Sequence, residues 1–422
     1  MTDSPVFKFN GSNDEVLVYL PSTGQVGIVS KAAASKLPDT IKCDRNIGAD
    51  VCDSPYPPRF NKLTFYLSDQ CNMNCSYCYA ESNTASIVLP NNKIRTAIDY
   101  LFKTSVSDEV TVRFLGGEPT VAWNALEYAV IYAKSMSNEC NRTVRLVMES
   151  NGLWSDDQYR FITENFDHVG ISIDGPREIH DYNRKLLSGE GSYEYVYRTL
   201  KRLHEEHRLS FNLASVITSQ SVHRMCEITQ FFCEEFPGSD ISFTPMDDIG
   251  MRATLGKSSA PNMEHYLNEY IRAVKLAHSL NTGNELMTSV IYFDDLNCAL
   301  YCDCNGGNYF VLPSGHISSC TKVTRPSSEA SNMFIFGMVN ERDVTFSKKR
   351  YDALKSYNPL NIAKCAECFA VNICRAGCPL LKMRDDRIKW NEPLDYCEAI
   401  KKATLDYLWH VAAICNDGTL NI

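Results

Sequence analysis

The chain has 422 residues, more than one average domain, and 44% of them are hydrophobic, as expected for a globular protein with a buried core. A net charge of −9 argues against a nucleic-acid partner. No stretch is long and apolar enough to span a membrane, and the first residues lack the pattern of a secretory signal. We therefore expect a cytoplasmic protein without a membrane partner, whose 18 cysteines serve metal or redox chemistry.

The first segment, residues 1–58, carries a short β pattern. Residues 15–29 indicate a hairpin with its turn at 21–24, and 31–37 indicate a short helix. The proline-rich stretch 54–58 indicates an extended linker. An exposed edge strand here could capture an extended leader peptide. A strap that packs on the following domain fits the pattern equally well.

Strand-like and helix-like runs alternate from about residue 60 to 280. The predicted strands are 63–67, 110–115, 144–148, 169–173, 211–217 and 241–245. The predicted helices lie near 92–105, 125–137, 156–165, 193–207, 223–236 and 263–280. Such alternation predicts an α/β domain with a parallel sheet and right-handed crossovers. In closed barrels of this type, functional residues lie at the carboxyl ends of the strands.

Three cysteines follow the first predicted strand in a C-x3-C-x2-C loop: Cys71, Cys75 and Cys78. Three thiolates hold three irons of a cubane iron–sulfur cluster, whereas a closed [4Fe–4S] site needs four. The remaining iron is then free to bind a small molecule. Zinc also uses paired cysteines. A zinc site, however, does not account for the Gly116–Pro119 segment, which directly follows the second strand.

These two motifs, in this order, resemble the radical S-adenosylmethionine (radical SAM) superfamily. In that family the open iron binds the methionine part of SAM, and reductive cleavage of SAM gives a 5′-deoxyadenosyl radical that abstracts hydrogen. The protein supplies position and shielding. The resemblance implies a (β/α)6 partial TIM barrel over residues 59–285. It also implies that the segment after the second strand receives the amino group of SAM.

Further short motifs resemble the SAM contacts of the family. Glu149–Gly152 ends the third predicted strand and Ser172–Gly175 ends the fourth. By the resemblance, Arg184 pairs with the SAM carboxylate, which suits a guanidinium because the two groups bond bidentately. A surface arginine on a loop is the alternative. The expected SAM-binding residues are Tyr77, Gly116, Gly117, Glu118, Pro119, Ser150, Asn151, Ser172, Asp174 and Arg184.

A second cysteine array lies within residues 286–422. Its spacing, C-x15-C, a gap, C-x2-C-x5-C-x3-C, a gap and C, resembles SPASM domains, which carry two auxiliary [4Fe–4S] clusters. The resemblance assigns Cys304, Cys320 and Cys378 to auxiliary cluster I, and Cys365, Cys368, Cys374 and Cys397 to auxiliary cluster II. Cys298 is the better match for the fourth ligand of cluster I, and Cys302 competes with it. A zinc knuckle at residues 365–378 is the alternative.

The cofactors implied are three [4Fe–4S] clusters and SAM. Hydrogen abstraction leaves a carbon radical, and a new bond forms from it when one more electron leaves, so auxiliary clusters favour net oxidation. We therefore expect a radical SAM/SPASM peptide maturase. It would form a crosslink or another C–H-derived bond in a ribosomally made precursor peptide. Its partners would be that peptide and an electron donor such as flavodoxin or ferredoxin.

Other functions remain open at this point. Formylglycine-forming sulfatase maturases have an aspartate base directly after the cysteine equivalent to Cys320, where this chain has Thr321 and Lys322. That difference argues against sulfatase maturation. A peptide epimerase and a non-catalytic cluster-bearing scaffold are further alternatives. The catalytic base is unknown, because no acidic residue, such as Asp247 or Asp248, is singled out by the sequence.

Overall fold

The computed structural model describes residues 2–43, 55–80, 86–247, 259–293, 302–328, 330–357, 362–384, 387–388, 394–414 and 420–421. Two residues considered above, Asp248 and the expected ligand Cys298, lie outside these ranges. Within them, no helix is long and apolar enough to cross a bilayer.

The core of the molecule is a parallel sheet whose first six strands follow one another in chain order. These strands are β6 (Lys62–Tyr66), β7 (Glu109–Leu115), β8 (Thr143–Ser150), β9 (His168–Ser172), β10 (Ser210–Ile217) and β11 (Asp240–Pro245). All six predicted strands are confirmed. Their apolar side chains are buried; Val112 and Phe114 of β7, for example, are fully covered. Along β7 these buried residues alternate with partly exposed ones, because successive side chains of a strand point to opposite faces of the sheet.

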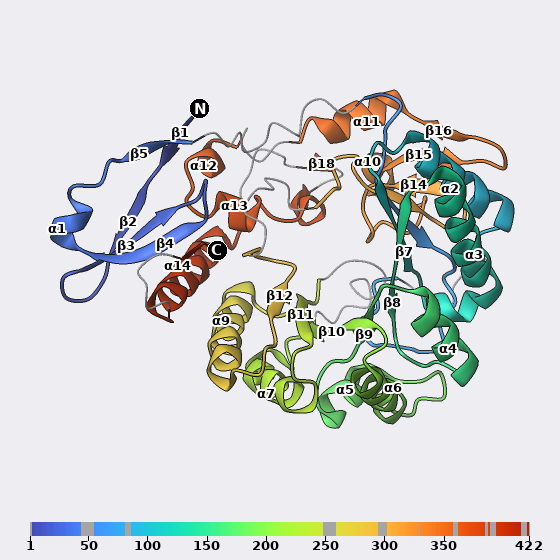
Figure 1. The fold of residues 1–422 in the computed structure, drawn as a ribbon, viewed down its shortest axis with the longest axis horizontal. Coiled ribbons are helices and arrows are strands. Elements are labelled where there is room, and N and C mark those ends of the chain that lie inside the picture. The colour runs from blue at the N-terminus through green and yellow to red at the C-terminus, as the bar shows by residue number, and fades with distance from the viewer. Residues whose placement is uncertain are drawn as a thin grey trace.

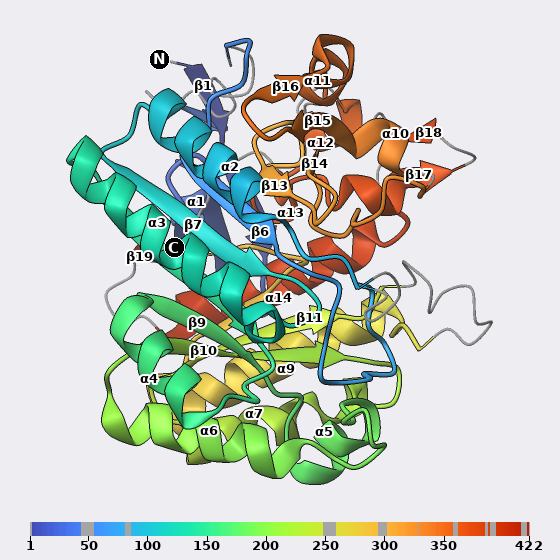
Figure 2. The ribbon, with the colours of Figure 1, turned by 90° about the vertical axis from the view of Figure 1, so that its right-hand side faces the viewer.

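Helices connect the strands and cover the outer side of the curved sheet (Figures 1 and 2). They are α2 (Asn91–Thr104), α3 (Trp123–Cys140), α4 (Asp156–Asn165), α6 (Tyr193–Glu206), α7 (Met225–Glu235) and α9 (Met263–Leu280), all near their predicted positions. Helix α4 begins at a capping box in which Ser155 and Gln158 satisfy each other's backbone amides. The sequence did not predict α5 (Arg177–Asn183), a short helix that leads to Arg184.

The sheet continues beyond the barrel into the cysteine-rich region. Strand β12 (Leu286–Thr288) pairs parallel with β11 at one edge, and β13 (Tyr309–Val311) pairs parallel with β6 at the other. Strands β14 (His316–Ser318), β15 (Ile335–Val339) and β16 (Val344–Phe346) then extend it to eleven strands. The remaining elements of this region are α10 (Ser331–Phe334), α11 (Lys348–Lys355), α12 (Ala363–Ala366), α13 (Val371–Cys374), β17 (Met383–Arg384), β18 (Arg387–Ile388) and α14 (Cys397–Ile414).

The N-terminal segment forms a separate small sheet in the order β19-β4-β3-β2. Its strands are β2 (Phe7–Asn10), β3 (Glu15–Leu20), β4 (Gln25–Ser30) and the C-terminal β19 (Leu420–Asn421), while β1 (Thr2–Pro5) pairs with β5 (Thr40–Cys43). The predicted hairpin is confirmed. Helix α1 (Lys31–Ala34) is shorter than predicted, and β1, β2 and β5 were missed. The sheet lies against α14 (Figure 1), so it packs on the cysteine-rich region rather than on the barrel helices.

Candidate active site

A cavity of about 390 Å³ opens at the carboxyl ends of the barrel strands. That volume is within the range of small-molecule and cofactor sites. Its walls come from the loop after β6, from the ends of β7 to β11, and from Thr321 and Lys322 of the cysteine-rich region. Cys71, Cys75 and Cys78 all line it. Both cysteine-bearing regions therefore contribute to one cavity.

Hydrogen bonds from distant segments fix the loop of the three cysteines. The amide of Asn74 donates to Lys185 O at 2.8 Å, and the amide of Ser76 donates to Asn183 O at 2.9 Å. On the other side, Asn151 Nδ2 donates to Asn72 Oδ1 at 2.7 Å. The loop is thus held between the end of β8 and the segment after α5.

Gly117 is required because two backbones meet there. Its amide donates to Ser68 O at 2.9 Å, and the next amide donates to Gln70 O at 2.8 Å. A Cβ on Gly117 would lie 2.3 Å from Gln70 O, well inside van der Waals contact. The glycine therefore lets the end of β7 approach the cysteine loop, which a larger residue would prevent.

Glu118 is buried and holds strand ends together. Its Oε1 accepts from the amide and hydroxyl of Thr120, at 3.1 and 2.8 Å, and from the hydroxyl of Ser150 at 2.8 Å. Its Oε2 accepts from the amide of Asn151 at 2.7 Å. Burial raises the pKa of Glu118, and these hydrogen bonds act in the opposite direction. Its carboxylate thus orients β7 and β8 relative to each other.

Arg184 is a buried residue, so the surface-arginine alternative is wrong. Its Nε donates to Asp174 Oδ1 at 3.0 Å, and Tyr77 Oη donates to Asp174 Oδ2 at 2.6 Å. Arg184 lines the cavity, whereas Asp174 lies behind it. The three residues join the cysteine loop, the end of β9 and the segment after α5.

Two further ion pairs lie in the cavity wall. Arg113 Nη2 donates to Glu149 Oε1 at 2.6 Å, and Lys322 pairs with Asp247. The sequence brought Glu149, Asp247 and Lys322 into consideration without indicating a role for them, and it did not single out Arg113. The signal was present for Arg113, because a charge between apolar residues of a predicted parallel strand has to face a polar interior.

Most of the expected cofactor residues meet in this cavity. Of the SAM-binding set, Tyr77, Gly116, Gly117, Glu118, Ser150, Asn151, Ser172 and Arg184 line it, and Pro119 and Asp174 do not. Lining residues that the sequence did not indicate include Met73, Tyr79, Leu115, Val216, Thr244 and Met246. Several of these are apolar, which suits a cavity that limits access of water.

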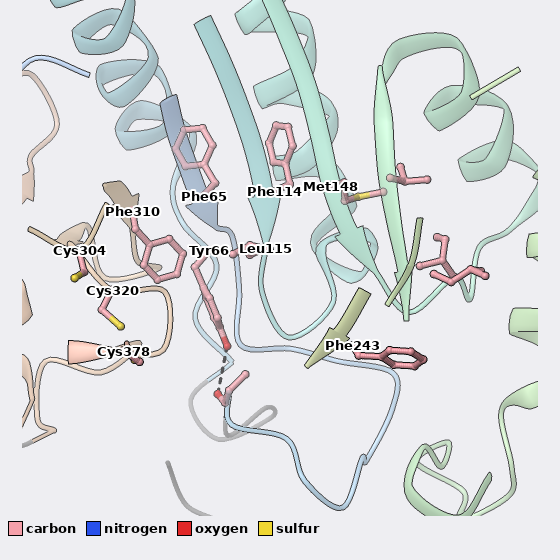
Figure 3. Close-up of a cluster of buried hydrophobic side chains, with 14 of the residues drawn as sticks. Phe65, Tyr66, Phe114, Leu115, Met148, Phe243, Cys304, Phe310, Cys320 and Cys378 are labelled. Carbon is pink, nitrogen blue, oxygen red and sulfur yellow. Dashed lines mark hydrogen bonds between the residues drawn. The ribbon is translucent and has the colours of Figure 1, made fainter. Parts of the chain in front are cut away.

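The cysteines of the C-terminal region fall into two groups. Cys304, Cys320 and Cys378 lie together beside Phe310 (Figure 3). The pKa of Cys304 is raised by a hydrogen bond to Cys302, by burial, and by the charges of Cys302, Cys320 and Cys378. In the second group, burial and then the charges of Cys397, Cys365 and Cys368 raise the pKa of Cys374. The groups have the membership expected for auxiliary clusters I and II, with Cys302 adjoining the first.

The surroundings of the second group suit an anionic cluster. Lys382 is buried, and within the described residues its Nζ has no hydrogen-bond partner. Burial lowers its pKa, and the charges of Cys365, Cys374 and Cys397 oppose that effect. A buried ammonium is costly unless a negative group neutralises it. A cluster held by thiolates would supply that negative charge.

No group of three potential ligands is arranged to hold a single metal ion in the described part of the chain. A cubane cluster has a different requirement, because each thiolate binds a different iron and the sulfur atoms therefore lie farther apart than around one ion. Cys71, Cys75 and Cys78 share one cavity, and the charges of Cys75 and Cys78 act on Cys71. The residues present therefore fit a cubane better than a single metal ion.

The fold is also found in known proteins. The chain is 23% identical over 366 residues to the cysteine-type anaerobic sulfatase-maturating enzyme of Clostridium perfringens, covering 82% of this chain and 95% of that one. A solved structure of native anSMEcpe with bound AdoMet and Cp18Cys peptide superposes with a TM-score of 0.64 at 20% identity, covering 85% and 100% of the two chains. Streptococcus suis SuiB bound to S-adenosylmethionine gives a TM-score of 0.59 at 14% identity, covering 81% and 77%.

The fold and the site together define an α/β enzyme of the radical SAM type with a cysteine-rich C-terminal region. Residues 65–232 match the radical SAM superfamily, so this part of the chain is a radical SAM domain. Its relatives include sulfatase-maturating enzymes. The expectation drawn from the cysteine loop and the Gly116–Pro119 segment is therefore confirmed for the family, as is the expected fold.

Proposed function

We propose that this chain is a radical SAM/SPASM maturase that acts on a precursor peptide and oxidatively forms a crosslink or another C–H-derived bond. The observation that carries the proposal is the shared cavity, which is lined by Cys71, Cys75 and Cys78 on one side and by Lys322 of the cysteine-rich region on the other. A peptide residue in this cavity would lie between the two regions. The solved relatives include anSMEcpe with a bound peptide and SuiB with the precursor peptide SuiA.

Each region has residues suited to hold its cofactors. The cluster that binds SAM would be held by Cys71, Cys75 and Cys78. The first auxiliary cluster would be held by Cys304, Cys320 and Cys378, together with Cys298 or Cys302. The second would be held by Cys365, Cys368, Cys374 and Cys397. When bound, the first cluster and SAM supply a radical that abstracts hydrogen from carbon. The chain's own part is positional. The backbone at Gly116–Glu118 and the Arg184 guanidinium would bind the amino-acid end of SAM, while Leu115, Val216 and Met246 limit access of water.

The charged groups of the cavity distinguish this proposal from sulfatase maturation. Thr321 follows Cys320, so no carboxylate is available at that position. The nearby carboxylate belongs instead to Asp247, which follows β11 in the chain and pairs with Lys322. The Asp247 side chain is 15% exposed, and both partners of this ion pair line the cavity. A proton acceptor in this chain would thus approach the substrate from the β11 side.

The likeness to the sulfatase-maturating enzyme favours a second candidate, formation of formylglycine from a cysteine residue. An anaerobic assay separates the two. The reconstituted chain would be incubated with SAM and a reductant, either with a cysteine-containing peptide of the Cp18Cys type or in cells that co-express a short peptide encoded beside the gene. Release of 5′-deoxyadenosine and the peptide mass would be measured.

The proposal predicts 5′-deoxyadenosine and a precursor peptide lighter by two hydrogen atoms per modification. Conversion of the cysteine-containing peptide to an aldehyde would support the second candidate instead. Unchanged mass with inverted stereochemistry would identify an epimerase. A chain that releases no 5′-deoxyadenosine, like a control with Cys71, Cys75 and Cys78 replaced by alanine, would be a scaffold.

A further inference from the structure

Arg184 has contacts that its expected role toward SAM does not explain. Its side chain is 8% exposed, and its guanidinium lies 5.3 Å from the centre of the Tyr77 ring. Its two chain neighbours, Asn183 and Lys185, accept hydrogen bonds from the amides of Ser76 and Asn74 at 2.9 and 2.8 Å, and Arg184 and Cys75 both line the cavity. Arg184 therefore lies opposite Cys75, one of the three cysteines that would hold the SAM cluster.

Asp174 fixes the position of this cation. Its side chain is 1% exposed, and it accepts from Arg184 Nε at 3.0 Å, from Tyr77 Oη at 2.6 Å and from the amide of Val216 at 3.1 Å. These partners belong to the cysteine loop, to β10 and to the segment after α5. The Arg184 charge is thus held beside Cys75 by a carboxylate that cannot turn away.

The two charges act on Cys75 in opposite directions. The Arg184 guanidinium places a positive charge next to Cys75, and the Asp174 carboxylate, 3.0 Å from Arg184 Nε, places a compensating negative charge beside it. The same electrostatics apply to a cluster bound through that sulfur. Reduction adds negative charge to a cluster, and nearby charges and hydrogen bonds to its sulfur atoms set its potential. Because the surroundings are buried, water screens these effects only weakly.

We propose that Arg184 sets the reduction potential of the iron–sulfur cluster held by Cys71, Cys75 and Cys78, and that Asp174 limits the size of this effect. Arg184 acts through Cys75, so it is a positioning and tuning residue for the redox step. The inference rests on the proposed function only for the assignment of the three cysteines to a cluster. It is independent of the peptide substrate.

A redox titration of the reconstituted enzyme, followed by electron paramagnetic resonance, tests this inference. It is done without SAM and without peptide, so that any contact of Arg184 with SAM cannot contribute. The paramagnetic resonance signal of the cluster held by Cys71, Cys75 and Cys78 is assigned as the signal that is absent from a Cys75→Ala variant. Arg184→Gln should lower the potential, and a tenfold fall in the reduced-to-oxidised ratio corresponds to about 59 mV for one electron.

Asp174→Asn should shift the potential in the opposite direction, because it removes the negative charge and keeps an acceptor for Arg184 Nε. Arg184→Lys retains the charge and should lie between wild type and Arg184→Gln. Tyr77→Phe is the matched control, since it removes one hydrogen bond to Asp174 and leaves both charges in place. Its shift should be smaller than that of either charge variant.

Opposite shifts in Arg184→Gln and Asp174→Asn support the inference. Unchanged potentials with reduced thermal stability would overturn it, since they would show that the ion pair is only structural. Shifts of the same sign in both variants would overturn it as well. If Arg184→Gln retains too little iron, Arg184→Lys and Asp174→Asn decide the question by the same criterion. Failure of peptide modification with these shifts intact would count against the proposed function and not against this inference.

Discussion

Gly117 illustrates how one residue positions the cysteine loop. We predict that Gly117→Ala destabilises the protein by about 1–3 kcal/mol, the range typical of overpacking. The added methyl group would lie 2.3 Å from Gln70 O, so the loop that carries Cys71 has to move. Iron retained per chain after reconstitution, together with the melting temperature, measures the effect.

Gly189→Ala is the control for this prediction. Gly189 has φ of +89° and no atom within 4 Å of an added Cβ, so alanine there meets backbone strain without a clash. It should cost less stability and leave the iron content unchanged. Equal iron loss in both variants would contradict the explanation by close approach.

Lys382 gives a second prediction at the scale of the residue. In the metal-free protein, Lys382→Met should increase stability by about 1–3 kcal/mol, because it removes a buried ammonium that has no hydrogen-bond partner within the described residues. In the reconstituted protein the same change should reduce the stabilisation by iron, because a positive charge beside Cys365, Cys374 and Cys397 is lost. Chemical denaturation of the metal-free and the reconstituted protein measures the free energy of unfolding of each.

Lys401→Met is the control here, because Lys401 is a half-buried lysine near Cys368 and Cys397 that already pairs with Glu398 at 2.8 Å. Lys401→Met should change the stability of the metal-free protein and of the reconstituted protein much less than Lys382→Met does. A Lys382→Met protein that is less stable than wild type without metal would show that Lys382 does not carry an uncompensated charge.

At the scale of elements, the short strand β13 joins the cysteine-rich region to the barrel. It pairs with β6, and its Tyr309 stacks on Phe60 with ring centres 4.8 Å apart and meets Tyr100 edge-on at 5.7 Å. We predict that Phe60→Ala destabilises the protein by about 3–5 kcal/mol. Hydrogen exchange should become faster at the amides of β13 than in β8 or β9.

Tyr100→Phe provides the comparison. It keeps the ring that faces Tyr309 and removes only the hydrogen bond from Tyr100 Oη to Pro58 O, which is 2.6 Å long. Its effect on β13 exchange should be small. If both variants accelerated exchange equally, the aromatic contacts would not be the feature that holds β13 on β6.

At the scale of the whole molecule, the two regions are expected to bind iron independently. Three [4Fe–4S] clusters correspond to about twelve irons per chain. Replacing Cys71, Cys75 and Cys78 by alanine should remove about four and leave the others, and replacing Cys365, Cys368 and Cys374 should also remove about four. Iron and sulfide analysis with Mössbauer spectroscopy measures both.

A value near eight in the unmutated chain would show that one auxiliary site does not hold a cluster. Comparing Cys298→Ala with Cys302→Ala then identifies the fourth ligand of auxiliary cluster I. Cys302 adjoins Cys304 in the structure, and Cys298 lies outside the described residues. A chain that holds zinc instead of iron would contradict the cluster assignment as a whole.

The sequence alone determined the barrel, its six strands and the cysteine loop, because a buried strand needs apolar residues on the face that packs against the core and a cubane requires thiolates at fixed spacing. It did not reveal that β13, only three residues long, joins β6, or that β19 pairs with β4 of the N-terminal sheet. Short strands lack a periodic signal, and pairing over such separations depends on the packed chain.

For the charged residues of the cavity, too, some features could be predicted from the sequence and others depend on the folded chain. Motifs indicated Glu118, Asp174 and Arg184, but folding was needed to bring Glu118 to the ends of two strands and to pair Arg184 with Asp174 opposite Cys75. Asp247 and Lys322 belong to segments far apart in the chain, and folding brings them to one wall. Local sequence specifies which groups are present, whereas their electrostatic partners are set by contacts that no local pattern encodes.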